Sequence, residues 1–134
     1  MKISSKGRYA VRVMAELGKH YDEVMSVSEL SEKQGITIKY LEKVISLLVK
    51  AKLIISIRGA NGGYKLTKKP AECTIADILT ATGDMPELSP CVKNGKVCSR
   101  KKDCLSISCW DSLALLITNY LQSVTLEDLI NKKI

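Results

Sequence analysis

The sequence SVSELSEKQGITIKYLEKVISLLVKAKLIISIRGANGGYKL, residues 26–66, decides the fold of this chain. Ser26 and Glu29 have the three-residue spacing of a capping box, which predicts the start of a short helix. Gly35 ends this helix, because glycine readily adopts the positive φ that closes a helix. Thr37 then caps a second helix through residue 52, whose apolar residues share one face: Leu41, Val44, Ile45, Leu48 and Ala51.

The residues that follow this helix pair predict a β-hairpin. Residues 53–58 (LIISIR) are rich in β-branched side chains, residues 59–63 (GANGG) form a turn, and residues 64–66 return as a strand. Two short helices joined by a tight turn, followed by a hairpin, are typical of a winged helix-turn-helix. The predicted fold class is therefore mostly α with a small β-hairpin wing. Such a fold places its second helix in the major groove of DNA.

The rest of the chain divides into three expected parts. Residues 1–83 form the winged helix-turn-helix domain, with a first helix over residues 2–20 and a short helix over 75–81 that Thr74 caps and Gly83 ends. Residues 84–103 lack periodicity and form a cysteine-bearing, cluster-binding loop. Residues 104–134 hold the longest helix, over 104–123, and a last helix capped by Thr125.

The longest helix has apolar side chains over most of its circumference. Leu105, Leu113, Leu116 and Tyr120 form one stripe, and Trp110, Ile117 and Leu121 form another. A single amphipathic helix needs only one apolar face, so the second face must meet another chain or a large part of the core, and a homodimer is the economical answer. We therefore expect a homodimer, in which two reading helices meet two half-sites.

The charge is concentrated in the first half of the chain. Residues 1–70 hold 14 basic and 6 acidic groups, net +8, whereas residues 71–134 hold 7 and 8, net −1. This imbalance favours double-stranded DNA as the partner. Arg12 on the first helix is a further possible phosphate contact, and Glu42 is expected to select bases, because it repels phosphate. The candidate DNA-binding residues are Lys6, Arg8, Lys39, Tyr40, Glu42, Lys43, Arg58, Gly59 and Asn61.

Several function classes are disfavoured. No apolar run approaches the ~20 residues of a membrane helix, and residues 1–17 lack the continuous apolar segment of a secretory signal, so a cytoplasmic protein without membrane contact is expected. An enzyme is not expected, because there is no glycine-rich phosphate loop and His20 is the single histidine. His20 is expected to be a solvated residue at a helix end.

Four of the five cysteines lie close together in the sequence. Cys91, Cys98 and Cys104 have the spacing C-x6-C-x5-C, and Cys109 follows five residues later. This differs from the C-x2-C pairs of zinc ribbons, and clustered soft thiolates suit an iron–sulfur cluster. On a helix that begins at Cys104, Cys109 is rotated by about 140° and is expected to be buried rather than to ligate. Cys73 is expected to be a small buried residue.

The chain resembles the IscR-like iron–sulfur cluster regulators of the Rrf-type winged-helix family over nearly its whole length. The resemblance rests on residues 5–11 (SKGRYAV), 40–42 (YLE) and 58–64 (RGANGGY), on the three cysteines followed by Leu105 and Trp110, and on Thr125-Leu126. It implies a homodimer crossed through the long helix, a 2Fe-2S cluster held by Cys91, Cys98 and Cys104, and control of genes for iron–sulfur assembly.

The sequence departs from the family pattern at the fourth cluster ligand. IscR-like proteins have a histidine three residues after the last cysteine, where this chain has Ile107. The candidates for the fourth position are a small molecule or one of five side chains: Cys109, Ser106, Ser108, Asp103 and His20.

Three functions follow from these patterns. The first is a DNA-binding repressor controlled by an iron–sulfur cluster. The second keeps the DNA-binding domain but makes the thiols a direct redox switch without a metal. The third is an iron–sulfur carrier or electron-transfer protein that does not bind DNA, which the charge of residues 1–70 disfavours.

Overall fold

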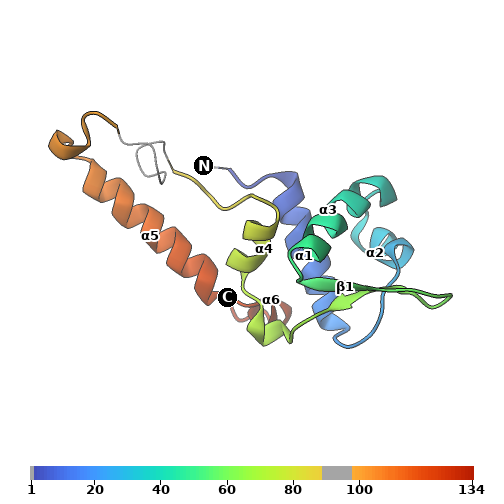
Figure 1. Cartoon of the computed structure of the whole chain (residues 1–134). Helices are drawn as coiled ribbons and strands as arrows, with labels where there is room; N and C mark the ends of the chain where they lie inside the picture. The colour runs from blue at the N-terminus through green and yellow to red at the C-terminus, as the bar shows by residue number, and fades with distance from the viewer. Residues whose placement is uncertain (1, 89–97) are drawn as a thin grey trace.

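The computed structural model describes residues 2–88 and 98–134 and confirms the predicted fold class (Figure 1). It is mostly helical, with one two-stranded antiparallel hairpin. The elements are α1 (Ser5–Lys19), α2 (Val27–Gln34), α3 (Ile38–Lys50), β1 (Ile54–Ile57), β2 (Gly63–Leu66), the 3-10 turn η1 (Pro70–Glu72), α4 (Ile75–Ala81), the 3-10 turn η3 (Lys101–Asp103), α5 (Ile107–Ser123) and α6 (Leu126–Ile130).

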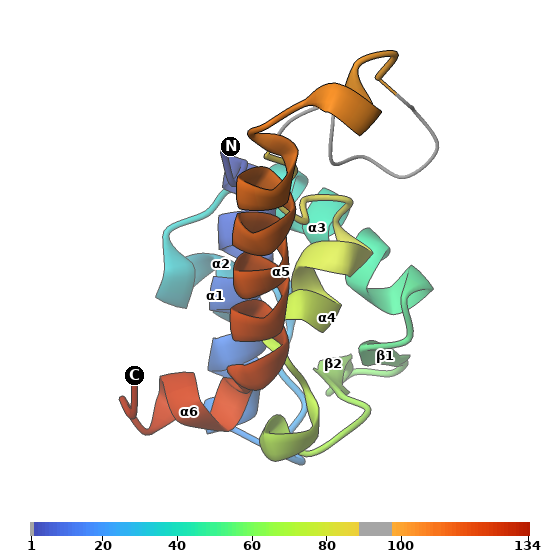
Figure 2. The ribbon, with the colours of Figure 1, turned by 90° about the vertical axis from the view of Figure 1, so that its left-hand side faces the viewer.

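Helix α1 lies at the centre of the fold and packs against α2, α3, α4, α6 and β2. Figure 2 shows it behind α5, with α4 on one side and α6 below. Its apolar residues Ala10, Val13, Met14 and Leu17 share one side of the helix and are all fully buried. The helix starts at Ser5 rather than at residue 2, because the Ser4 side chain caps it by accepting a hydrogen bond from Gly7 N at 3.2 Å.

Helices α2 and α3 form the predicted helix-turn-helix. Ser26 caps α2 by accepting from Glu29 N, and Gly35 ends it with φ 64°. Thr37 caps α3 by accepting from Tyr40 N, which leaves only a tight turn between the helices. The apolar face of α3 is buried as expected: Leu41, Val44, Ile45 and Leu48.

The C-terminal end of α3 has a strained residue. The helix stops at Lys50, not at residue 52, because Lys52 N donates to Val49 O and Leu53 N donates to Leu48 O. These two bonds are a Schellman motif, which satisfies the last carbonyls of the helix. The motif needs positive φ, and Lys52 supplies it at 61° although a lysine has a Cβ that disfavours this conformation.

The wing lies at the expected place, with its first strand shorter than predicted and its second strand one residue longer. Strands β1 and β2 pair from Ile54 with Leu66 to Ile57 with Gly63, and residues 58–62 form the turn. Met25, just before α2, adds a short bridge to the hairpin, since its N and O bond Tyr64 at 2.9 and 2.8 Å. A Cβ at Gly63 would lie 2.2 Å from Met25 O, so only glycine fits there. The wing is therefore fixed to the start of α2.

Two similar capped turns hold the C-terminal part of the chain against the domain. Thr74 and Asp77 form a capping box at α4, and Thr125 and Asp128 form one at α6. The two N-cap residues pair with each other as an antiparallel bridge, in which Ile75 N donates to Val124 O and Leu126 N to Cys73 O, both at 2.9 Å. Residues 124–126 thus join the core of the first 83 residues.

Helix α5 packs on α4 through one side and extends away from the domain (Figure 1). No residue of α5 is fully buried. The helix begins at Ile107, so the prediction that it begins at residue 104 is wrong. Ser106 occupies the N-cap position, and Cys104 before it is extended. None of the helices within residues 2–88 and 98–134 is long and apolar enough to cross a membrane.

The strain at Lys52 gives a stability prediction. Lys52→Gly should raise the free energy of unfolding by about 0.5–1 kcal/mol, because glycine adopts positive φ without a Cβ clash. Urea denaturation followed by circular dichroism measures the change. Lys50→Gly is the matched control, and it should lower stability by a similar amount, about 0.5–1 kcal/mol, because residue 50 is helical. Equal destabilisation by both substitutions would contradict the assignment of strain.

Candidate nucleic-acid interface and cysteine end

The outer face of α3 is polar and exposed. Lys39, Glu42, Lys43 and Ser46 are all exposed, and together with Leu47 they line a shallow open hollow. Tyr40 is half-buried, because its ring meets the ring of Tyr9 edge to face, with centroids 5.4 Å apart. This face therefore offers two cations, a carboxylate and a hydroxyl to a partner. Glu42 lies between the two lysines in the sequence, and its negative charge weakens the electrostatic attraction of this face for any polyanion.

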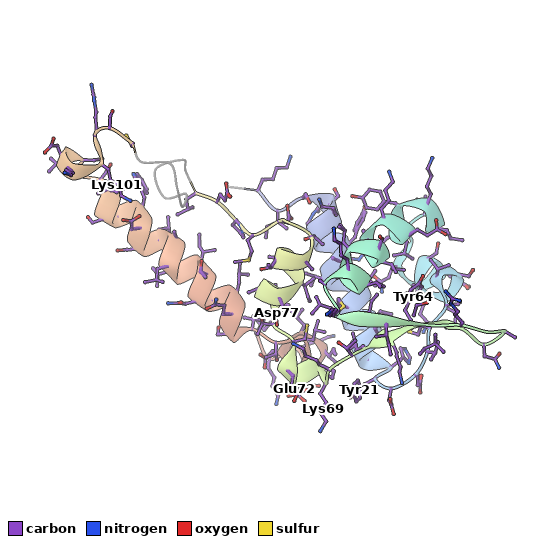
Figure 3. The ribbon with its side chains drawn as sticks, viewed as in Figure 1. Tyr21, Tyr64, Lys69, Glu72, Asp77 and Lys101 are labelled. Carbon is purple, nitrogen blue, oxygen red and sulfur yellow. The ribbon has the colours of Figure 1, made fainter. Side chains whose placement is uncertain are left out.

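The wing brings a second set of candidate residues to the surface. Arg58, Gly59 and Asn61 are all exposed in the turn of the hairpin, which projects from the domain (Figure 1). Gly59 has φ 118°, and its carbonyl accepts from Gly62 N at 3.0 Å, so the turn closes on itself. Part way along the hairpin, where it pairs with Ser56, Tyr64 contacts the core and anchors the wing (Figure 3). Arg58 is thus held away from the helices of the domain, at the turn of the β1–β2 hairpin.

The start of α1 lies next to the start of α3. The contact between Tyr9 and Tyr40 joins the N-terminal half of α1 to the first turn of α3. Arg8 is exposed and its guanidinium donates to Ser5 Oγ at 3.1 Å, while Lys6 is half-exposed. The basic residues that were predicted at separate places in the sequence therefore come from neighbouring elements in the fold: α1, α3 and the wing.

A carboxylate connects the start of the cysteine-bearing segment to α1. Asp84 Oδ2 accepts a hydrogen bond from Ser4 N at 2.7 Å, at the N-terminus of α1. The helix dipole favours a negative charge at this place. A Cβ at Gly7 would lie 2.1 Å from the same oxygen, so glycine makes the approach possible. The chain that leads into residues 84–103 is therefore fixed beside Lys6 and Arg8.

The described cysteines of the second half lie at the far end of α5. Cys98 and Cys109 are exposed free thiols and Cys104 is a half-exposed one, whereas Cys91 lies outside the described residues. In Figure 3, Lys101 marks this end, opposite the wing and Tyr64. Within residues 2–88 and 98–134, no three histidine, cysteine or acidic side chains are grouped closely enough to hold a metal ion.

Cys104 has a polar neighbour that favours its thiolate. Its Sγ lies 3.3 Å from Ser106 Oγ. Hydrogen bonds from the Ser106 side chain and backbone, with a further one from the Ile107 backbone, lower the pKa of the Cys104 thiol below its ordinary value. Free N–H groups at a helix start are good partners for an anion. Cys73 is the opposite case, since burial raises the pKa of its thiol to about 11 and Asp77 adds to the effect.

The expectation that Cys109 is buried is wrong for this chain. Cys109 is exposed because α5 extends away from the domain and none of its residues is fully buried. The rotation of about 140° does not apply, since residues 104–106 precede the helix, and Leu105 among them is 99% exposed. Cys109 and Ser106 thus remain candidates for a fourth ligand, and His20 does not, because it is held at the other end of α1 by Glu16 and Glu23.

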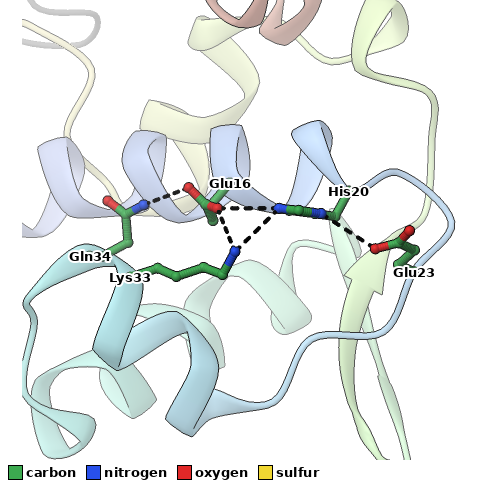
Figure 4. Close-up of polar contacts among 5 residues, drawn as sticks. All are labelled: Glu16, His20, Glu23, Lys33 and Gln34. Carbon is green, nitrogen blue, oxygen red and sulfur yellow. Dashed lines mark hydrogen bonds and ion pairs between the residues drawn. The ribbon is translucent and has the colours of Figure 1, made fainter.

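The sequence analysis missed a polar network between α1 and α2 (Figure 4). Glu16, which lies on the buried side of α1, accepts from Gln34 Nε2 at 2.9 Å and pairs with Lys33 at 3.7 Å and with His20 at 3.5 Å. His20 is therefore a partner in this network rather than a solvated end residue. The available signal was Glu16 itself, an acidic residue one position from Leu17 within the apolar stripe.

Comparison with known proteins gives a consistent result. The family model Rrf2, described as an iron-dependent transcriptional regulator, matches residues 3–132. The HTH-type transcriptional regulator IscR of Photorhabdus laumondii is 36% identical over 134 residues, which cover 99% of this chain and 81% of that protein. These matches are in line with the resemblance that the sequence motifs indicated.

Two solved structures are similar over nearly their full lengths. The global cysteine regulator CymR of B. subtilis has a TM-score of 0.75 and 34% identity, and the alignment covers 98% of both chains. IscR of T. potens has a TM-score of 0.77 and 31% identity, with coverage of 100% of this chain and 89% of that one.

Proposed function

The chain belongs to the Rrf2 family of transcriptional regulators, and from this membership we propose that it represses transcription by binding DNA under the control of its cysteines. The relatives are named as transcriptional regulators, so the expectation that the chain is not an enzyme is confirmed. The observation that carries the proposal is the exposed basic face of α3 beside a projecting wing with Arg58 at its tip. Genes for iron–sulfur assembly are the first targets to test.

In the proposed complex, α3 enters the major groove. Lys39, Tyr40 and Lys43 lie on its outer face, and the wing brings Arg58, Gly59 and Asn61 to the flanking backbone or minor groove. Lys6 and Arg8 contact phosphates from the start of α1. Glu42 accepts a hydrogen bond from a cytosine amino group, so its role is to select sequence rather than to add affinity.

We predict that DNA binding depends on salt through these cations. Arg58→Ala, or Lys6→Ala with Arg8→Ala, should weaken binding and reduce the slope of log K against log salt by roughly 0.9 per lost phosphate contact. Glu42→Ala is the contrasting variant, because removing a negative charge should relax discrimination at one base pair without weakening binding in general. Fluorescence anisotropy at several salt concentrations measures both effects. An unchanged slope in all the cationic variants would show that another face binds DNA.

The proposed active form is a homodimer through α5. Leu115, Leu116 and Tyr120 are 60%, 65% and 55% exposed in the single chain, and Trp110 and Leu113 are also exposed. Ile117 and Leu121 on another side of the helix are half-buried, as expected where α5 packs on α4. An exposed apolar stripe along a helix is costly in water and is typical of an interface. The occupant of this face is a second α5, which also supplies the second reading helix for a two-fold operator.

The dimer gives a mass prediction. At micromolar concentration, light scattering should give the wild-type protein a molar mass of twice the 14.8 kDa of one chain. Leu116→Glu should give a monomer, because a carboxylate in the apolar interface has no partner. Gln122→Glu is the control, since Gln122 is polar and exposed on the same helix. A monomeric wild type would remove the dimer from the proposal.

The proposed ligands of an iron–sulfur cluster are Cys91, Cys98 and Cys104. The donor chemistry of the described cysteines fits such a group, because their thiols are unbridged and exposed or half-exposed, and Arg100, Lys101 and Lys102 lie between them. A 2Fe-2S cluster supplies one-electron redox chemistry and a dependence on iron supply. Asp103, Ser106, Ser108 and Cys109 are the side-chain candidates close to Cys104 in the sequence for the fourth position.

The cysteine variants test this assignment. Alanine at Cys91, Cys98 or Cys104 should abolish the visible absorbance, iron and acid-labile sulfide of protein purified without oxygen. Cys73→Ala is the control and should keep all three signals, because Cys73 is buried in the core beside residues 124–126, at the opposite end of α5 from Cys104 and Cys109. Cys109→Ala decides whether that thiol is the fourth ligand, because alanine offers no ligating atom. Wild-type protein with neither iron nor sulfide after anaerobic reconstitution would reject the cluster.

A thiol switch without a metal is the second candidate. It is favoured by the exposed thiols of Cys98 and Cys109 and by the structural similarity to CymR, a cysteine regulator. In that case a mild oxidant would change DNA binding in iron-free protein, and the change would be reversed by a thiol reductant. A carrier that binds no DNA is disfavoured by membership in a family of transcriptional regulators.

A further inference from the structure

Arg12 is placed where a phosphate contact was expected, but its guanidinium is already engaged within the protein. Its Nε donates to Gln34 Oε1 at 3.1 Å, and its Nη2 donates to the Gln34 backbone carbonyl. The guanidinium also lies over the ring of Tyr9, 5.4 Å from the centroid. A planar group that donates two hydrogen bonds from one edge and stacks through one face is held in a single orientation.

The contacts with Gln34 fix the end of α2. Gln34 is the last residue of α2, so its carbonyl has no partner within the helix and Arg12 supplies one. The Gln34 amide is held from its other side by Glu16 at 2.9 Å, and Lys33 Nζ lies 3.7 Å from the same carboxylate (Figure 4). Both of the last two residues of α2 are therefore tied to α1 through polar contacts.

The contact with Tyr9 leads to the start of α3. Tyr9 meets Tyr40 edge to face, and Tyr40 lies in the first turn of α3. Arg12 thus touches the residue that ends α2 and the ring that packs on the start of α3. The turn between these helices, residues 35–37, therefore has a contact of Arg12 just before it, at Gln34. Just after it, Tyr40 is contacted by Tyr9, the ring that Arg12 covers.

We infer that Arg12 is a positioning residue for the reading helix, acting through Gln34 and Tyr9, rather than a phosphate contact. This inference rests on the proposed DNA-binding function. Specific contacts need Tyr40, Glu42 and Lys43 to meet base edges in one orientation of α3, so they depend on the angle that Arg12 helps to fix. Non-specific attraction depends on charge alone, so it does not depend on that angle.

Lysine in place of arginine separates the two roles. Arg12→Lys keeps the positive charge but loses the planar fork and most of the stacking on Tyr9. A phosphate contact survives this change, because lysine binds phosphate as a point charge. A positioning role does not survive it. The informative quantity is the ratio of specific to non-specific affinity, which a change in folding stability alone leaves unaltered well below the unfolding temperature.

The experiment uses the full-length protein and two duplexes. One is the duplex that the wild type enriches from a random-sequence pool, and the other is a shuffled duplex of the same base composition. Arg12→Lys should bind the selected duplex roughly three- to tenfold more weakly, the loss expected for one or two hydrogen bonds. Its affinity for the shuffled duplex and its salt slope should equal those of the wild type. Lys19→Arg, a charge-conserving substitution at an exposed residue of the same helix, is the matched control and should change none of these quantities.

A second variant tests the route through Gln34. Gln34→Ala should also lower the selectivity, and the double variant should lose less than the sum of the two single losses, because both substitutions remove the bond between Arg12 Nε and Gln34 Oε1. Circular dichroism checks that each variant is folded.

The outcomes are distinct. A selectivity of Arg12→Lys equal to that of the wild type overturns the inference, and so does an equal loss on both duplexes or additive losses in the double variant. If the wild type binds neither duplex in a salt-dependent way, the proposed function fails and the inference fails with it.

Discussion

The packing of the apolar stripe of α1 is the constraint on which the other elements depend. Ala10, Val13, Met14 and Leu17 are buried against helices from both halves of the chain and against the wing strand β2. Burying a side chain of this size stabilises a fold by about 1.5–3 kcal/mol, whereas a surface ion pair contributes about 0–1 kcal/mol. The helix-turn-helix is therefore held in place by the stripe, and the polar groups of α1 only adjust it.

Polar contacts of α1 add to the packing of the apolar stripe at two places. Asp84 reaches the N-terminus of the helix, and Glu16 with Arg12 reaches the last turn of α2. Among residues 2–88 and 98–134, Glu16 is the only charged residue that is buried, and it has partners on three sides. A buried carboxylate without partners would be costly. Its partners come from α1 and α2. The carboxylate therefore keeps them only while the two helices stay in this arrangement, which stabilises the arrangement.

The sequence was sufficient for elements that have local signals. The caps at Ser26, Thr37, Thr74 and Thr125, and the glycine stop at Gly35, each depend on residues within one turn, and all lie where they were expected. The start of α5 was misplaced because the spacing of apolar residues does not show whether the helix begins at Cys104 or only after Ser106. The exposure of Cys109 was missed because an apolar pattern does not distinguish a core from an interface. The contact of Arg12 joins residues 22 positions apart, and no local pattern reports it.

The position of the cysteines at the outer end of α5 has an evolutionary consequence. The helix holds 17 residues, so its far end lies about 25 Å from the bridge between Thr74 and Thr125. No residue of α5 is fully buried in the single chain, and residues 98–103 before it are exposed. Substitutions at this tip therefore cost little folding free energy. Evolution can therefore replace the cysteines and other ligands at this tip without changing the core of the domain. One fold can in this way come to respond to different chemical signals in different descendants.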